Sequence, residues 1–435
     1  MPDPLTEQPA DTLNATQTVA AIRAGRLTAT QAATACLHRI ALRDGAIQAW
    51  AHLDRATALE SARSTDVAGA TGALAGLPIG VKDVITTRDF PTTYNCRFHE
   101  AARSDAHADA SCVAILRQAG ATIIGKTATV ELASIGAVPP TMNPQAPGHT
   151  PGGSSSGSAA AVADGHVPVA LGTQTGGSII RPASFCGVWA LKPTWGLIAT
   201  EGAKPFSPSL DTIGWFARDA GDLGLVLDVF APGQRDVPPL QDLRIALWQT
   251  PVWHAAEADT RTAMTQCATM LAKAGANVEQ LVLPPLFEAL AEDQLTIMFG
   301  EGGRSFLREA VLGPDLIAPA ILDMVRNRRN ITAQILREAM DRTARCRAEF
   351  DRLTAPFDAV ICPSTPGPAP FGLDATGSLI FNGMLTALNI PAVNMPLHRT
   401  PAGLPVGLTL CGPRWSDHKV LSVAQAIGTH TKTQP

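Results

Sequence analysis

With 435 residues, 46% of them hydrophobic and 17% charged, the chain is long enough to bury a large core and too apolar to be disordered. Its 38 acids and 34 bases give a net charge of −4, which provides no basic surface for nucleic acid or an anionic membrane. We therefore expect a compact globular protein with no nucleic-acid partner and no membrane partner.

No segment predicts membrane insertion or export. The longest apolar runs fall short of the roughly 18 residues of a membrane span, because Asp164, His166 or Pro168 interrupts them. The first residues, Met-Pro-Asp-Pro-Leu-Thr-Glu, carry acids where an export signal needs a basic start. The expected location is the cytoplasm.

The eight cysteines and ten histidines are scattered, without a Cys-x-x-Cys pair or a His-Glu-x-x-His helix. We therefore expect reduced thiols, no metal and no organic cofactor. Cys186 lies between the apolar Phe185 and Val188, which predicts a core thiol with a raised pKa rather than a nucleophile.

The first part of the chain predicts helices and then an alternation of helix and strand. After a polar start at 1–14, apolar residues at helical spacing predict two or three helices over 15–63. Apolar alternation predicts a strand over 77–81. A helix over 110–119, stopped by a glycine, leads into a strand over 121–124.

The next part contains a long loop. Residues 137–158 are rich in Pro, Gly, Ser, Thr and Asn and run into an alanine-rich helix at 159–163. Such a segment inside a compact domain is more often an active-site loop than a linker. The remaining elements are, in order, a surface crossing at 231–243, a strand at 244–248, a helical stretch over about 257–355 and a strand from 357 to 362.

This alternation of helix and strand is typical of an α/β protein. We find no internal repeat and no clear boundary, so residues 1–435 are expected to form one large domain. The N-terminal helices, within 1–70, are expected to pack on it.

The segment Gly120–Thr127 matches the spelling of a phosphate-binding loop, G-x-x-x-x-G-K-[ST]. Such a loop follows a strand and opens a helix, whereas here a helix precedes Gly120 and the middle is apolar and β-branched. We interpret the segment as a helix stop followed by a strand that ends at Gly125.

The segment Gly153–Gly157 matches the G-x-S-x-G spelling of a nucleophile elbow, with Ser155 at its apex. That elbow needs a strand immediately before it. The preceding residues, 142–152, contain prolines that remove hydrogen-bond donors from a sheet. This spelling is therefore not interpreted as a nucleophile elbow.

A third set of residues suits an amide hydrolase that works without histidine. Lys82 follows the apolar strand 77–81, so its amine is expected to point into the interior, where desolvation lowers its pKa. The loop 152–158 offers hydroxyls that can pass on a proton. Gly176 and Gly177 precede Ser178, where small residues allow successive N–H groups to converge on one oxyanion.

The sequence resembles the amidase signature family, the Ser-cisSer-Lys amidohydrolases, over nearly its whole length. The matching stretches are Gly76-Leu-Pro-Ile-Gly-Val-Lys-Asp83, His149-Thr-Pro-Gly-Gly-Ser-Ser-Ser-Gly-Ser-Ala-Ala-Ala-Val-Ala163, Gly172-Thr-Gln-Thr-Gly-Gly-Ser178, Arg181-Pro-Ala-Ser-Phe-Cys-Gly187, Leu191-Lys-Pro-Thr-Trp-Gly196 and Leu404-Pro-Val-Gly-Leu-Thr-Leu410. The resemblance implies a central, mostly mixed β-sheet flanked by helices.

The resemblance also implies a role for each matching residue. Lys82 matches the family's base, Ser154 its bridging serine after a cis peptide bond, and Ser178 its nucleophile. The backbone amides of Thr175, Gly176, Gly177 and Ser178 match its oxyanion hole.

This chain departs from the family's commonest spelling in two places. Ser156 stands in the second glycine pair, so any torsion that requires glycine there must be relaxed. Gln174 and Ile180 stand where many members carry Asp and Arg, which leaves Arg181 one place along and Asp83 within sequence reach of Lys82. Arg181 and Lys192 are expected to be structural ion-pair partners.

Taken together, these residues predict hydrolysis of a carboxamide through an acyl-serine, releasing ammonia or an amine, with carbamates and esters also compatible. The alternative is the glutaminase or transamidating A-type subunit of a tRNA-dependent amidotransferase. The near-neutral charge and the lack of a docking tail favour a free-standing hydrolase with an amide substrate and water, and no obligate partner chain. A homodimer is compatible with this interpretation.

The substrate contacts implied by the resemblance are Ala133 and Ser134, which follow the strand that contains Gly-Lys-Thr. A lid is expected from the divergent stretch around 290–335, within the helical insertion or lid region over about 257–355. Its apolar residues are Met298, Phe299, Phe306, Ile317 and Ile321, which are equally compatible with the core of a helical layer.

Overall fold

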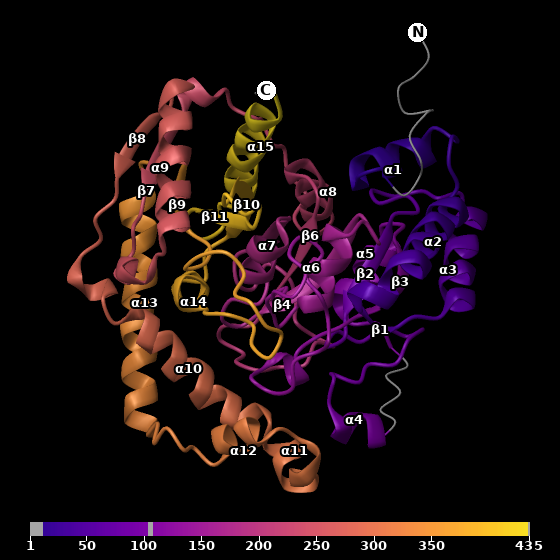
Figure 1. The fold of residues 1–435 in the computed structure, drawn as a ribbon, viewed down its shortest axis with the longest axis horizontal. Helices are drawn as coiled ribbons and strands as arrows, with labels where there is room; N and C mark the ends of the chain where they lie inside the picture. Colours follow the sequence, from indigo (N-terminus) through magenta and orange to yellow (C-terminus); the bar gives the residue numbers. More distant parts are fainter. Residues whose placement is uncertain (1–11, 103–107, 434–435) are drawn as a thin grey trace.

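A sheet of eleven strands runs through the molecule in the order β1-β3-β2-β4-β6-β5-β10-β11-β9-β7-β8 (Figure 1). This computed structural model describes residues 12–102 and 108–433. The strands are β1 (Trp50–His52), β2 (Pro78–Lys82), β3 (Thr122–Thr127), β4 (Val169–Gln174), β5 (Trp189–Lys192), β6 (Thr212–Ala217), β7 (Arg244–Leu247), β8 (Asn277–Gln280), β9 (Ala359–Pro363), β10 (Ala392–Arg399) and β11 (Pro405–Cys411).

The sheet is mixed. Strand β2 pairs in parallel with β3 and β4, and β7 pairs in parallel with β8 and β9. The pairs between β4 and β9 across the middle of the sheet are antiparallel. The structure therefore confirms the expected single α/β domain with a mixed central sheet.

Helices cover this sheet; in this view α10 to α12 lie below it, and the long α13 runs upward from them toward β9 (Figure 1). The helices are α1 (Ala15–Arg23), α2 (Ala29–Ile47), α3 (Arg55–Val67), α4 (Arg97–Ala102), α5 (Ser111–Gln118), α6 (Ser156–Ala163), α7 (Ile180–Cys186), α8 (Ala220–Phe230), α9 (Ala258–Lys273), α10 (Leu290–Ser305), α11 (Leu307–Leu312), α12 (Pro319–Val325), α13 (Ala333–Thr354), α14 (Ile380–Ala387) and α15 (Asp417–Thr433). Short 3₁₀ turns are η2 (Glu131–Ala133), η3 (Leu240–Asp242), η4 (Trp253–Ala255), η5 (Pro285–Phe287) and η6 (Pro314–Leu316).

Several expected elements differ in detail. The strand expected to end at Gly125 continues to Thr127, and the stretch over 257–355 is interrupted by strand β8. Strand β1 separates the helices expected over 15–63. Most of the polar start at 1–14 lies outside the described residues. Among the helices of residues 12–102 and 108–433, none combines the length and apolar character that crossing a membrane requires.

Helix α6 holds the long loop against the sheet. It packs on β2, β3, β4 and β6, because its alanines and glycine allow a close approach. A Cβ atom on Gly157 would lie 2.2 Å from the carbonyl oxygen of Ala49 and 2.4 Å from the amide nitrogen of Ala128. Only glycine fits there, and its contact holds the end of the loop against the start of β1 and the end of β3.

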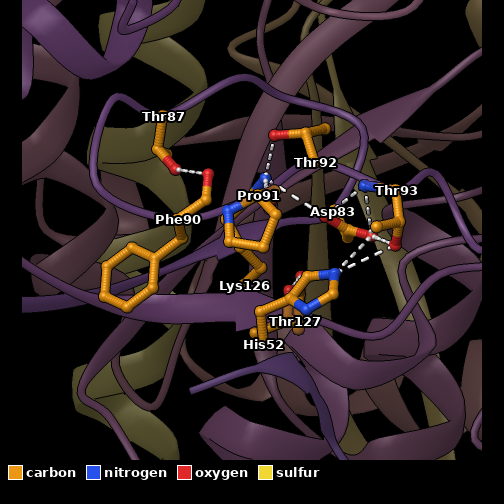
Figure 2. Close-up of polar contacts among 10 residues, drawn as sticks. His52, Asp83, Thr87, Phe90, Pro91, Thr92, Thr93, Lys126 and Thr127 are labelled. Carbon is orange, nitrogen blue, oxygen red and sulfur yellow. Dashed lines mark hydrogen bonds and ion pairs between the residues drawn. The ribbon is translucent and has the colours of Figure 1, made fainter. Parts of the chain in front are cut away.

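A buried ion pair fixes the segment that follows β2 (Figure 2). The Nζ atom of Lys126 lies 3.1 Å from Asp83 Oδ1 and donates to the hydroxyl of Thr92 at 2.5 Å and to the carbonyl of Pro91 at 3.3 Å. The other oxygen, Asp83 Oδ2, accepts a bond from the hydroxyl of Thr93 at 2.8 Å. Neither charged side chain is exposed. This pair ties β3 to the residue directly after Lys82.

We expect Lys126→Met to lower the free energy of unfolding by about 3 kcal/mol or more, because it leaves the Asp83 carboxylate buried without its cation. Urea unfolding measures the difference. The matched control is Lys419→Met, which breaks a half-exposed pair with Asp358 and should cost less than about 1 kcal/mol. Equal losses for the two variants would contradict this account of the pair.

Candidate active site

Strand β2 carries Lys82 into the interior. Its neighbour Val81 lies opposite Leu171 of the parallel strand β4, so Lys82 ends beside the last residues of β4. Its Nζ atom donates to Ser154 Oγ and to Thr173 Oγ1, both at 2.8 Å. The side chain is fully buried, as expected.

The environment of Lys82 favours the neutral amine. Burial lowers the pKa of Lys82 well below its usual range; the charge of Asp211 opposes this decrease and the guanidinium of Arg181 adds to it. Asp83, the carboxylate within sequence reach, is bound to Lys126 instead. A buried neutral amine can accept a proton.

Ser154, the expected bridging serine, lies in an anchored loop. The peptide bond between Gly153 and Ser154 is cis, as the resemblance implies. Arg181 Nη2 and Nε donate to the carbonyl of Gly153 at 2.6 and 3.2 Å, and Arg181 Nη1 donates to the carbonyl of Gly377 at 2.6 Å. Ser156 begins α6 with negative φ, so the departure from glycine causes no backbone strain.

Neither cation expected in an ion pair forms one. Within the described residues, no carboxylate lies within 4.0 Å of the charged atoms of Arg181 or Lys192. Arg181 bonds to backbone carbonyls, and Lys192 Nζ donates to the carbonyl of Pro193 at 2.8 Å. Burial lowers the pKa of Arg181 to about 10 and that of Lys192 to about 8. Both cations are bound by backbone carbonyl oxygens instead of the expected acids. A sequence pattern does not show which backbone oxygens a side chain will meet.

The backbone of the 175–178 loop turns its carbonyls toward two packed helices, α10 and α14. The carbonyl of Thr175 accepts a bond from Gln294 Nε2 at 3.1 Å, and that of Gly176 accepts one from Thr386 Oγ1 at 2.7 Å. Because a trans peptide places C=O and the next N–H on opposite sides, the N–H groups of Gly176 and Gly177 point away from these helices. They are thus available to an oxyanion.

The two glycines of this loop lie close to the start of α14. A Cβ atom on Gly176 would lie 3.1 Å from Leu379 Cδ2, and one on Gly177 would lie 3.0 Å from the Cβ atom of Asn382. A larger residue at either position would require its neighbour to move by a few tenths of an ångström.

Gln174 stabilises the end of this loop. Its Oε1 atom accepts bonds from the amides of Ile179 and Ile180 at 2.8 and 3.0 Å. Its Nε2 atom donates to Thr386 Oγ1 at 2.9 Å. The neutral amide of Gln174 therefore binds the turn that follows Ser178. It needs no cation at position 180, where this chain has isoleucine.

The loop forms one wall of a cavity of about 320 Å³. Ser178, which is 8% exposed, lies in this wall. The remaining lining residues come from several segments: Val130, Ala133, Ser134, Ile135, Gly136, Val138, Thr175, Gly176, Gly177, Arg181, Phe206, Met298, Asp374, Ala375, Thr376, Gly377 and Leu379. Both expected contact residues, Ala133 and Ser134, are among them.

The expected lid contributes one residue to this cavity, Met298. The other four (Phe299, Phe306, Ile317 and Ile321) pack in a second apolar cluster between α10 and its neighbours. These residues are therefore core rather than lid. No motif indicated Phe206, Gln294 or Asp211, which lie far from the catalytic motifs in sequence.

The two other nucleophile candidates from the sequence, Ser155 and Cys186, are buried and occupied in other contacts. Ser155 is buried, and its hydroxyl bonds to the backbone of Thr173. Cys186 is a core thiol whose pKa is raised by burial, as expected. Within residues 12–102 and 108–433, no three His, Cys, Asp or Glu side chains are grouped to hold a metal ion.

Three comparisons with known proteins agree on the kind of protein that this chain resembles. A family model described as Amidase matches residues 31–421. The A-type subunit of the glutamyl-tRNA(Gln) amidotransferase from Koribacter versatilis (strain Ellin345) is 31% identical, covering 94% of this chain and 96% of its own. Native peptide amidase from Stenotrophomonas maltophilia is 28% identical, with a TM-score of 0.78 and 98% of each chain covered.

A further solved structure is described as a vestigial protein complex that reveals the evolutionary origins of an s-triazine catabolic enzyme. It is 28% identical, with a TM-score of 0.85, and covers 95% of this chain and 98% of its own.

The similarity to amidotransferase subunits contradicts the expectation that no obligate partner chain is needed. The amidotransferase relative, which matches along almost its full length, is named as one subunit of that enzyme. Net charge and the lack of a docking tail could not reveal this, because interfaces between subunits are built from folded surfaces whose overall polarity resembles the rest of the protein.

We expect Gln174→Met to lower the free energy of unfolding by about 2 kcal/mol or more, because two buried amides lose their acceptor. Urea unfolding is again the measurement. Gln249→Met replaces an exposed glutamine and should change stability by less than about 0.5 kcal/mol. A Gln174 variant as stable as this control would show that the amide does not hold the turn.

Proposed function

Because the chain belongs to the amidase family, we propose that it hydrolyses the C–N bond of a carboxamide through an acyl intermediate on Ser178. One observation carries this proposal: the fully buried amine of Lys82 is bonded to Ser154 at 2.8 Å, beside the loop that contains Ser178. That arrangement supplies a neutral base and a hydroxyl relay without histidine.

In the acylation step, Ser178 Oγ forms a bond to the amide carbon while its proton passes through Ser154 to Lys82. The carbonyl oxygen becomes an oxyanion, which the N–H groups of the 175–178 loop stabilise. When the C–N bond breaks, Lys82 returns the proton through Ser154 to the leaving nitrogen. Ammonia or an amine departs, and the acyl group remains on Ser178.

In the deacylation step, water attacks the acyl carbon, and its proton follows the same relay to Lys82. The proton then returns to Ser178 as the acyl–oxygen bond breaks. The products are the carboxylic acid and free enzyme, so each cycle consumes one water molecule.

The full-length similarity to one subunit of an amidotransferase favours glutamine as the amide and a role within an assembly. In that role the released ammonia is the useful product. The cavity is compatible with such a substrate, because the buried cation Arg181 lines it and glutamine carries a carboxylate.

A second candidate is hydrolysis of another small amide. It is favoured by the structural similarity to peptide amidase and by the apolar side chains that line the cavity, such as Phe206, Met298 and Leu379. Carbamates and esters present a similar carbonyl and belong to this candidate.

Ammonia or amine release from glutamine, aliphatic amides, aryl amides and carbamates tests the proposal. We expect at least one to be hydrolysed, and Ser178→Ala to lower turnover by at least about a thousandfold, because the acyl group has no acceptor oxygen. Ser155→Ala is the matched control and should retain turnover. An inactive Ser155→Ala beside an active Ser178→Ala would favour the elbow interpretation instead.

The rate should fall as the pH drops through the apparent pKa of Lys82, because only the neutral amine accepts the proton. The optimum should lie on the alkaline side of neutral, while burial keeps this acid limb below the usual lysine range. Lys82→Ala should lose activity by orders of magnitude. Lys82→Arg should lose nearly as much, since guanidinium stays protonated; near wild-type amide turnover by this variant would rule out Lys82 as the base.

A further inference from the structure

A buried carboxylate lies behind the 175–178 loop, at a position that no motif indicated. Strands β4 and β6 pair with Gln174 opposite Thr212, so the residues just beyond this pair, Thr175 and Asp211, meet at the end of the sheet. Thr175 donates its hydroxyl to Asp211 Oδ1 at 2.5 Å. Asp211 Oδ2 accepts bonds from the amides of Phe206 and Ser207 at 2.8 and 3.0 Å.

Asp211 and Lys82 lie at the same end of three neighbouring strands. Lys82 ends β2, Thr173 lies near the end of β4, and Asp211 precedes β6, which is the next strand. Lys82 Nζ reaches Thr173 Oγ1 at 2.8 Å. Asp211 and Thr173, whose hydroxyl binds Lys82, line the same second cavity of about 250 Å³, together with Thr175.

Other charged groups near Lys82 are either paired with another side chain or lower its pKa, whereas Asp211 raises it. Asp83 is paired with Lys126, and Lys204, which lines the second cavity, lies 2.7 Å from Glu309. Arg181 lowers the pKa of Lys82, whereas Asp211 raises it; both effects are smaller than that of burial.

The pKa of Asp211 is set by its burial and by the groups that bind its carboxylate. Burial raises the pKa of Asp211 to about 6, the bonds from Thr175, Phe206 and Ser207 oppose this, and the charge of Glu301 adds to the increase. At neutral pH the group is therefore mostly a carboxylate.

We propose that Asp211 is a positioning residue of the hydrolytic site, which anchors the 175–178 loop through Thr175 and places a negative charge near the amine of Lys82. The anchor fixes the first residue of the loop, whose carbonyl Gln294 holds from the other side. The charge keeps the amine basic enough to take a proton from Ser154. This inference rests on the proposed function and adds a residue that never touches the substrate.

The two effects can be separated by following the rate at which a sulfonyl fluoride labels Ser178 across pH, measured by mass spectrometry of the intact chain. This probe needs no knowledge of the natural substrate. Asp211→Asn removes the charge, and Thr175→Val removes the anchoring hydroxyl while the carboxylate remains. Thr175→Ser restores the hydroxyl. Glu201→Gln changes another acid beside the second cavity and is the control.

For Asp211→Asn we expect labelling at least about tenfold slower at its optimum, and an acid limb shifted to lower pH by about one unit, since loss of a nearby negative charge lowers the pKa of an amine. Thr175→Val should slow labelling and shift this limb less than Asp211→Asn does, because the carboxylate remains although it loses one of the bonds that lower its pKa. Thr175→Ser should label almost as wild type does. Glu201→Gln should change neither quantity. A purely structural role would lower the rate without moving the limb.

An unshifted acid limb in a folded Asp211→Asn variant would overturn the electrostatic part of the proposal. If that variant fails to fold, as judged by circular dichroism, the threonine pair decides: equal rates for Thr175→Val and wild type would overturn the anchoring part. If the wild-type chain is not labelled at Ser178, the proposed function fails first. The two failures are therefore distinguishable.

Discussion

The site depends on removing one amine from water. Lys82 is carried inward by a strand that is buried on every residue, and its two hydrogen-bond partners are hydroxyls rather than carboxylates. A hydroxyl accepts a bond without stabilising the charge as strongly as an acid would. The adjacent acid, Asp83, is kept away because it is bound to Lys126. This arrangement lets the amine lose its proton and still remain ordered.

Hydrogen bonds from side chains, rather than ion pairs, also order the backbone around Lys82. The amide of Gln174 and the hydroxyl of Thr386 hold both faces of the segment that contains Ser178. Arg181 holds the preceding loop through backbone carbonyls. Hydrogen bonds to backbone groups thus do most of the positioning, and few charged groups lie close to Lys82.

The sequence was sufficient for the residues that form continuous motifs and for four strands of the sheet, β2, β3, β7 and β9. Lys82, Ser154 and Ser178 each lie in a segment whose local pattern is distinctive, and their relay role remains a prediction. Among the strands that had no expected counterpart, β1 and β8 are the two edges of the sheet. They are three and four residues long and none of their residues is buried, so they lack the alternation that marks a strand.

The side chains that support the site could not be predicted because they come from distant parts of the sequence. Gln294 meets Thr175 across 119 positions, and Thr386 meets Gly176 across 210. Such contacts leave no spacing to recognise, because only the folded chain brings these residues together. The same holds for the apolar residues of the expected lid, whose burial in a separate cluster depends on how α10 packs on α12 and α13.

The second cavity has a consequence for how this chain can change. Phe206 forms part of the wall of both cavities, together with Ala133 and Thr175. A smaller side chain at 206 would enlarge both spaces, about 320 and 250 Å³, while every proton-transfer group stayed in place. Under the proposed mechanism, substrate size and proton transfer depend on different residues, which leaves selection free to alter the first by a single substitution without disturbing the second.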